Sequence, residues 1–270
     1  MKKQVLIISL LLIALFAVFS GCTGSQGAVA GTSGAVKEIM VYCGAGMSEP
    51  MEEIASEFTA ETGIEVNYNF GGSGTLLSQM EITEKGDVYM PGSTADFNTA
   101  KDKGFIASEA LVAYHVPVIA VPKGNPAGIT CLADLGNEDV KVELGDPSAC
   151  AIGRLGNKII EKNKLNSTIY PNVVSRGATV NEVVMHTALG NADASIIWED
   201  LGDSDDLELI YIPNSGNIVK VVPVGALTFS KNPEEAQEFV DFVSSEKGLS
   251  IFEDYGFTTY PSDKYSDVKA

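Results

Sequence analysis

Apolar stretches alternate with amphipathic stretches along the chain from about residue 37 onward. Residues 64–70 alternate apolar and polar side chains, which predicts a strand with one buried face. Apolar residues recur at helical spacing over 51–58, and Ser48 and Pro50 precede them as a cap and a first-turn proline. Further strands and helices alternate in the same way up to a final helix that ends near Tyr255. This pattern predicts an α/β fold with parallel-rich sheets covered by helices.

Two longer apolar segments contain prolines and interrupt the alternation, at residues 111–122 and 219–227. Proline is unfavourable inside a sheet, so each segment is more typical of chain that crosses between two lobes than of one long strand. The prediction is therefore two lobes joined by two hinge crossings, with a ligand cleft between them. The expected first lobe comprises residues 37–117 and 224–270, and the expected second lobe comprises residues 118–223.

The first 36 residues carry export signals rather than a folded core. Lys2 and Lys3 precede an apolar run that is short for a membrane span and is followed by small residues, which predicts a signal peptide over residues 1–21. Small residues directly before Cys22 resemble the lipobox of exported lipoproteins, in which the cysteine is lipidated. An ordinary secreted protein with a cysteine nearby is the alternative. Residues 22–36 predict a flexible tether of roughly 20 Å, so we expect a protein anchored to the outer face of the cell membrane.

Net charge narrows the range of partners. The 270 residues carry a formal net charge of −18, which becomes about −20 once the signal peptide and its two lysines are removed. Nucleic acid and anionic lipid both require a basic surface, so the charge argues against them and leaves the lipid anchor as the expected membrane contact. Besides the lipidated cysteine there remain Cys43, Cys131 and Cys150, an odd number that leaves at least one free thiol. Their spacing matches no zinc site.

Four turns rich in glycine and small polar residues follow predicted strands and open predicted helices. Their sequences are VYCGAGMSEPM, YNFGGSGTLLSQM, GDPSACAIG and ATVNEVV, which begin at residues 41, 68, 145 and 178. A helix start presents unpaired backbone N–H groups and the positive end of the helix dipole, and glycine permits close approach of a ligand. Because ligands bind at the carboxyl ends of strands in open α/β sheets, the four turns together predict one anion site.

Individual side chains near these turns have candidate roles. The Ser73 hydroxyl can donate to an anion besides capping its helix. Trp198, the only tryptophan, follows a strand and either walls the cleft or belongs to the core. His115 and His186 lie in apolar stretches and are interpreted as packed structural residues. The turn at 44–46 lacks the third glycine and the ribose-binding acid of a dinucleotide site, which argues against that function.

The segment from Val41 to Ser93, the LADL, GDP and ADASIIWED segments and the closing IFEDYGF resemble the molybdate-binding proteins of ABC transporters. The resemblance covers nearly the whole chain beyond the tether. It implies the two-lobed type II periplasmic-binding-protein fold and a monomer that captures molybdate or tungstate and hands it to a membrane permease. It also implies a binding protein rather than an enzyme, with no cofactor other than the bound oxyanion.

The binding positions of that family fall on this chain with some departures. Ser73 occupies the position of the second oxyanion-binding serine, whereas Gly46 occupies that of the first and leaves only backbone N–H groups there. Trp198 stands where the family has a tyrosine and donates through nitrogen. The expected ligand-binding residues are Gly46, Met47, Ser48, Ser73, Ile152, Val180, Asn181 and Trp198.

Several alternatives stay open at this point. Glu182 and Glu199 could place carboxylates on the metal of the oxyanion, as in some archaeal relatives, although Glu182 also fits a capping box with Thr179. The cleft could instead hold a small carboxylate or phosphoester. An exported hydrolase with Cys150 or Ser73 as nucleophile lacks an identifiable base. A surface antigen or sensor of the same fold is a further alternative.

Overall fold

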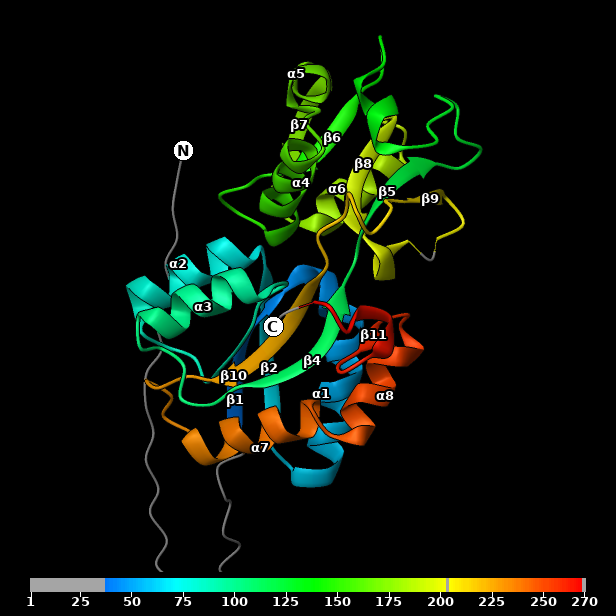
Figure 1. Cartoon of the computed structure of the whole chain (residues 1–270). Coiled ribbons are helices and arrows are strands. Elements are labelled where there is room, and N and C mark those ends of the chain that lie inside the picture. The colour runs from blue at the N-terminus through cyan, green and yellow to red at the C-terminus, as the bar shows by residue number, and fades with distance from the viewer. Residues whose placement is uncertain (1–36, 203, 269–270) are drawn as a thin grey trace, which may run out of the picture. The chain divides into compact units, whose positions relative to one another are not determined.

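Two β-sheets organise the part of the chain that the computed structural model describes, residues 37–202 and 204–268 (Figure 1). The signal peptide, Cys22 and the tether expected from the sequence lie outside the described residues. Each sheet is accompanied by helices, as the alternation of strands and helices predicts. None of the helices within the described ranges is long and apolar enough to span a bilayer.

The first lobe consists of a six-stranded sheet and the helices that pack on it. Its elements are β1 (Glu38–Gly44), η1 (Ala45–Met47), α1 (Ser48–Thr62), β2 (Glu65–Gly71), α2 (Ser73–Thr83), β3 (Val88–Met90), α3 (Thr94–Asp102), β4 (Ala110–His115), β10 (Lys220–Ala226), α7 (Pro233–Val243), α8 (Glu246–Asp254), β11 (Thr258–Thr259) and η5 (Asp263–Tyr265). The strand order is β11-β4-β10-β3-β1-β2. Helices α1, α7 and α8 share a core that includes Phe58 and Phe239, whereas α2 and α3 pack around Tyr89 (Figure 1).

The second lobe consists of a five-stranded sheet with its own helices. Its elements are β5 (Pro117–Pro122), η2 (Leu132–Gly136), β6 (Val142–Gly145), α4 (Ala151–Lys162), α5 (Asn166–Ile169), η3 (Tyr170–Asn172), β7 (Val173–Gly177), α6 (Val180–Ala188), β8 (Ala194–Trp198), η4 (Glu199–Leu201) and β9 (Leu207–Tyr211). The strand order is β7-β6-β8-β5-β9. Ile119, Ile159 and Val183 are fully buried in the core that joins this sheet to α4 and α6.

The chain passes between the two sheets twice. The first passage lies at Val116, because β4 belongs to the first sheet and β5 to the second. The second passage lies over residues 212–219, because β9 belongs to the second sheet and β10 to the first. The apolar segment at 111–122 therefore contains a crossing, as its prolines suggest. The segment at 219–227 consists mostly of β10, the strand that follows the second crossing. The expected lobe boundary between residues 223 and 224 falls inside this strand.

Both sheets are mixed rather than parallel throughout. The pairs of β1 with β2 and β3, and of β6 with β7 and β8, are parallel. Strands β10 and β5 run antiparallel to their neighbours. Parallel pairing requires a long crossover, usually a helix, whereas β5 and β10 come directly from the passages between the lobes. The alternation along the sequence carries no information about this reversal.

Paired glycines end the parallel strands on the side where the helices begin. In the first lobe Gly44 lies opposite Gly71, and in the second lobe Gly145 lies opposite Gly177. A helix begins within a few residues of each glycine. The two turns of each lobe are therefore neighbours in space, as the carboxyl ends of adjacent parallel strands require.

Candidate functional site

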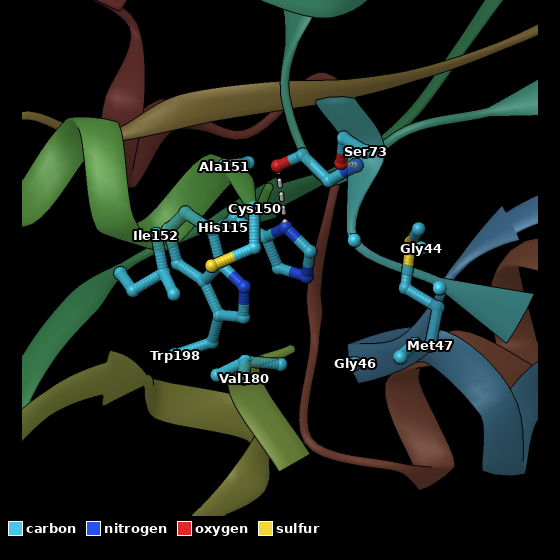
Figure 2. Close-up of a pocket in the computed structure, with 14 residues that line it drawn as sticks. Gly44, Gly46, Met47, Ser73, His115, Cys150, Ala151, Ile152, Val180 and Trp198 are labelled. Atoms are coloured by element: carbon cyan, nitrogen blue, oxygen red, sulfur yellow. Dashed lines mark hydrogen bonds between the residues drawn. The ribbon is translucent and has the colours of Figure 1, made fainter. Parts of the chain in front are cut away.

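A small cavity of about 20 Å³ lies where the turns of the two lobes meet (Figure 2). Its first-lobe wall comes from the ends of β1 and β2, from η1, and from the turn after β3. Its second-lobe wall comes from the starts of α4 and α6 and the end of β8. The lining residues are Gly44, Ala45, Gly46, Met47, Gly71, Gly72, Ser73, Gly92, His115, Cys150, Ala151, Ile152, Val180 and Trp198.

Helix starts dominate this lining. The residues that immediately precede α1, α2 and α4 are Met47, Gly72 and Cys150, and all three line the cavity, as does Val180 at the start of α6. The first N–H groups of a helix have no partner within the helix, and the helix dipole places partial positive charge there. None of the described residues that line the cavity is an aspartate, glutamate, lysine or arginine. The lining therefore favours an anion that is held by backbone and neutral side-chain donors.

Ser73 supplies a hydroxyl donor to the cavity. Its Oγ accepts a hydrogen bond of 3.0 Å from the backbone N–H of Gly92, and its carbonyl oxygen accepts one of 3.0 Å from the Tyr89 hydroxyl. Because the Gly92 N–H points to the Ser73 oxygen, the hydroxyl hydrogen is available to a ligand. Ser73 is buried, so an unpaired hydroxyl at this position would be unfavourable and a bound acceptor would relieve that cost.

His115 and Trp198 form an aromatic wall that joins the two lobes. Their rings stack at 4.3 Å between centroids and 8° between planes (Figure 2). The His115 Nδ1 lies 2.8 Å from the Gly92 carbonyl oxygen, which can only accept, so Nδ1 carries the hydrogen. Burial lowers the pKa of His115 to about 4, and the imidazole is therefore neutral near pH 7.

Direct contacts between the lobes surround the cavity. The Ala149 carbonyl oxygen accepts from the backbone N–H of Gly74 at 2.9 Å and of Thr75 at 3.3 Å. The Asn181 Nδ2 donates to the Ala45 carbonyl oxygen at 3.1 Å. The Arg154 guanidinium of α4 forms an ion pair with the carboxylate of Asp96 in α3, and that carboxylate is buried. These contacts hold the two lobes together around the site.

The structure brings six of the expected ligand-binding residues together in the lining. They are Gly46, Met47, Ser73, Ile152, Val180 and Trp198. Ser48 and Asn181 lie beside the cavity rather than in its wall, where they line an adjoining recess of about 50 Å³.

The two carboxylates considered as extra ligands point elsewhere. The Glu182 N–H donates to the hydroxyl of the N-cap residue Thr179 at 3.2 Å, and the Glu182 carboxylate accepts a hydrogen bond of 2.7 Å from the N–H of Ala178, one residue before the N-cap. Only the first half of the expected capping box therefore forms, and the carboxylate is held at the helix start. Glu199 lines a separate cleft of about 740 Å³ together with Glu49, Glu253 and Asp254. That cleft is acidic and would repel an anion.

Sequence reasoning missed Gly92 and His115 as parts of the wall, whereas Cys150 lies in the recognised turn GDPSACAIG. Gly92 follows the third parallel strand of the first sheet, so its turn carried the same signal as the four that were recognised. His115 was interpreted as a packed residue, which describes its burial but not its contact with the cavity. Burial raises the pKa of the Cys150 thiol, which opposes thiolate formation and weakens the case for a cysteine nucleophile.

Comparison with known proteins places the chain among solute-binding proteins. The sequence model of the family described as "Bacterial extracellular solute-binding protein" matches residues 39–258. A Haemophilus influenzae protein named as a binding protein is 30% identical over 225 residues, which cover 82% of this chain and 90% of that one. The molybdate-binding protein ModA of Mycobacterium tuberculosis is 26% identical over 244 residues, which cover 89% and 92%. A Bacillus subtilis protein named as an ABC transporter substrate-binding lipoprotein is 26% identical over 249 residues, covering 90% and 94%.

Solved structures share the fold at low sequence identity. The periplasmic molybdate-binding protein of Azotobacter vinelandii has a TM-score of 0.70 and 16% identity, covering 82% of this chain and 98% of that one. The sulfate-binding protein SubI of Mycobacterium tuberculosis has a TM-score of 0.74 and 15% identity, covering 86% and 90%. PEB3 of Campylobacter jejuni with bound L-phospholactate has a TM-score of 0.68 and 22% identity, covering 82% and 99%. These likenesses confirm the expected two-lobed periplasmic-binding-protein fold.

Proposed function

The chain belongs to the bacterial extracellular solute-binding protein family, and from this premise we propose that its interlobe cavity captures a small tetrahedral oxyanion, molybdate or tungstate first, for an ABC importer. The observation that carries the proposal is the convergence of four helix starts and the Ser73 hydroxyl on a cavity whose described lining has no charged side chain. Relatives named as molybdate-binding proteins support the same ligand class.

The size of the cavity favours a compact anion. A cavity of about 20 Å³ is larger than the roughly 10–15 Å³ that a water molecule requires. A tetrahedral oxyanion, with four oxygens around one central atom, is larger than a water molecule but more compact than an organic phosphate, which extends beyond its phosphate group. A small phosphoester or carboxylate, the alternative ligand class, would therefore require the lobes to stand further apart than they do here.

The chemistry of the lining also predicts discrimination among oxyanions. Backbone N–H groups, the Ser73 hydroxyl and the Trp198 indole N–H are donors available from the lining. Phosphate at neutral pH carries a proton that needs an acceptor, whereas molybdate, tungstate and sulfate carry none. A donor-rich site leaves the proton of phosphate unpaired, and this disfavours phosphate.

The decisive experiment is calorimetric titration of the purified protein with molybdate, tungstate, sulfate, phosphate and phospholactate in turn. We expect 1:1 binding of molybdate or tungstate and much weaker binding of phosphate and phospholactate. Ser73→Ala should weaken binding by about 10-fold or more, since a hydrogen bond to a charged group contributes roughly 1.5–3 kcal/mol. Ser78→Ala in the same helix is the matched control, because Ser78 is exposed and bonds only the Gly74 carbonyl. The absence of binding to both molybdate and tungstate would refute the assigned ligand.

Two further elements of the proposal concern the cellular setting. We infer that Cys22 carries a lipid anchor and that the following tether holds the binding protein near a membrane permease as a monomer. Metabolic labelling with a fatty-acid analogue should mark the wild-type protein and not Cys22→Ala; equal labelling of both would exclude this anchor.

We expect no turnover of ester or phosphoester substrates. Turnover abolished by Cys150→Ala or Ser73→Ala would instead support the hydrolase alternative.

A further inference from the structure

Two neighbouring side chains next to the cavity have buried polar atoms without partners. Among the described residues, three buried side-chain polar atoms lack a hydrogen bond, and two of these are the Nε2 of His115 and the Oδ2 of Asp200. The His115 Nε2 lies 3.8 Å from the other carboxyl oxygen of Asp200, and both side chains are at most 3% exposed. His115 ends β4 in the first lobe, whereas Asp200 lies in η4 of the second lobe. The pair therefore spans the two lobes.

The contacts of His115 determine what its second nitrogen can do. Because Nδ1 donates to the Gly92 carbonyl oxygen, the Nε2 of the neutral imidazole carries a lone pair and needs a donor. Burial raises the pKa of Asp200 well above its usual range, so the carboxyl keeps a proton that it can donate. A hydrogen bond between oxygen and nitrogen is about 2.8 Å long, so an approach of roughly 1 Å would complete it.

A continuous series of hydrogen-bonding groups leads from this pair to the cavity. The Gly92 backbone is held on both sides, since its carbonyl accepts from His115 and its N–H donates to Ser73 Oγ at 3.0 Å. The Ser73 hydroxyl hydrogen is then the last donor in the series and faces the cavity. The carbonyl and the N–H of Gly92 belong to different peptide groups on either side of its Cα, so the series acts by fixing the position of the Gly92 backbone, and with it the Ser73 hydroxyl.

We propose that Asp200 and His115 are positioning residues for the ligand: closure of the lobes around an oxyanion completes the Asp200–His115 hydrogen bond and thereby fixes Gly92 and the donating Ser73 hydroxyl. The inference rests on the proposed function of the cavity as an oxyanion site. It assigns to a second-lobe carboxyl a role in a first-lobe contact with the ligand. The stacking of His115 on Trp198 holds the imidazole between the two ends of this series.

Matched variants separate this role from simple packing. His115→Phe keeps an aromatic ring against Trp198 but removes both nitrogens, and His115→Asn restores a donor near the position of Nδ1. Asp200→Leu removes the donor, whereas Asp200→Asn keeps an amide N–H that can reach Nε2. We expect tungstate affinity to fall by about 10-fold or more in His115→Phe and Asp200→Leu, and to stay within about 3-fold of wild type in Asp200→Asn.

A spectroscopic measurement completes the test. We expect tungstate to shift the ¹⁵N resonance of the His115 Nε2 in the wild type and in Asp200→Asn, but not in Asp200→Leu. Thermal unfolding without ligand checks that each variant is folded. If Asp200→Leu is not folded, the affinity test relies on His115→Phe. Wild-type affinity in Asp200→Leu or His115→Phe, or an unmoved Nε2 resonance in a wild type that binds tungstate, would overturn the proposal. A wild type that binds neither molybdate nor tungstate would instead refute the proposed function.

Discussion

A single methyl group at Gly72 should prevent the lobes from closing around a ligand. A Cβ at this position would lie 2.5 Å from the Ala149 carbonyl oxygen and 2.6 Å from the Ala178 carbonyl oxygen, both in the backbone of the second lobe. Gly72 itself has φ −69° and ψ 137°, which alanine adopts without strain. Gly72→Ala therefore changes the contact between the lobes and leaves the fold of each lobe intact.

The size of the effect follows from the contacts that are lost. Ordinary van der Waals contact begins at 3.4 Å, so the two backbones must separate by about 1 Å at this point. The hydrogen bond from the Gly74 N–H to the Ala149 carbonyl would lengthen from 2.9 Å beyond the range of a normal bond, and the longer bond from Thr75 would be lost as well. Two such bonds contribute about 1–3 kcal/mol, so molybdate or tungstate affinity should fall by roughly 10- to 100-fold.

Calorimetric titration and thermal unfolding test this prediction together. The ligand-free melting temperature of Gly72→Ala should stay close to that of the wild type, while the affinity falls. Gly156→Ala is the matched control, because a Cβ there meets only side-chain atoms of Ile196 at 3.7 Å or more. Wild-type affinity in Gly72→Ala would show that the interlobe contacts seen here do not form part of the ligand-bound state.

Three further predictions follow from other contacts. Gly46→Ser should weaken oxyanion binding by about 10-fold, because the Cβ of the new side chain would lie 3.0 Å from a Val180 methyl. The double variant Gly46→Ser with Val180→Ala should restore affinity in the same titration. Arg154→Leu should weaken binding while leaving ligand-free melting near that of the wild type, since it removes the interlobe ion pair to the α3 carboxylate; unchanged affinity would contradict this. Asp200→Asn should lose about 3 kcal/mol of stability in urea unfolding as pH falls from 6.5 to 4, because His115 with a folded pKa of about 4 binds fewer protons than the unfolded chain over this window. The wild type should lose less, because the raised pKa of Asp200 keeps a proton on the folded protein that the unfolded carboxyl lacks. Parallel pH profiles of the two proteins would refute the last prediction.

Much of the local structure could be predicted because it depends on local pattern. The strand expected at residues 64–70 is β2 at Glu65–Gly71, and the helix expected from the spacing over residues 51–58 is α1 at Ser48–Thr62. The pairing of strands was less accessible. Whether β10 joins the first sheet in antiparallel orientation depends on where the chain crosses between lobes, and hydrophobic period does not encode that.

The site shows the same division between local and tertiary information. Ser73 could be singled out because a hydroxyl at a glycine-rich helix start is a local signal. His115 could not, because its place in the wall depends on a stack with Trp198 more than eighty residues away and on the carbonyl of Gly92. Gly46, where the resembling family has a serine, has a tertiary explanation as well: Val180 and Trp198 occupy the space into which a side chain would project.

Anomalous diffraction from crystals grown with tungstate would test the central claim most directly, because tungsten scattering locates the anion without assumptions about its contacts. We predict one strong peak inside the cavity of Figure 2, with oxygens of the anion within hydrogen-bond distance of the Ser73 hydroxyl and of backbone N–H groups at the starts of α1, α2, α4 and α6. A tungsten peak outside this cavity, or none in crystals of protein that binds tungstate in solution, would contradict this prediction.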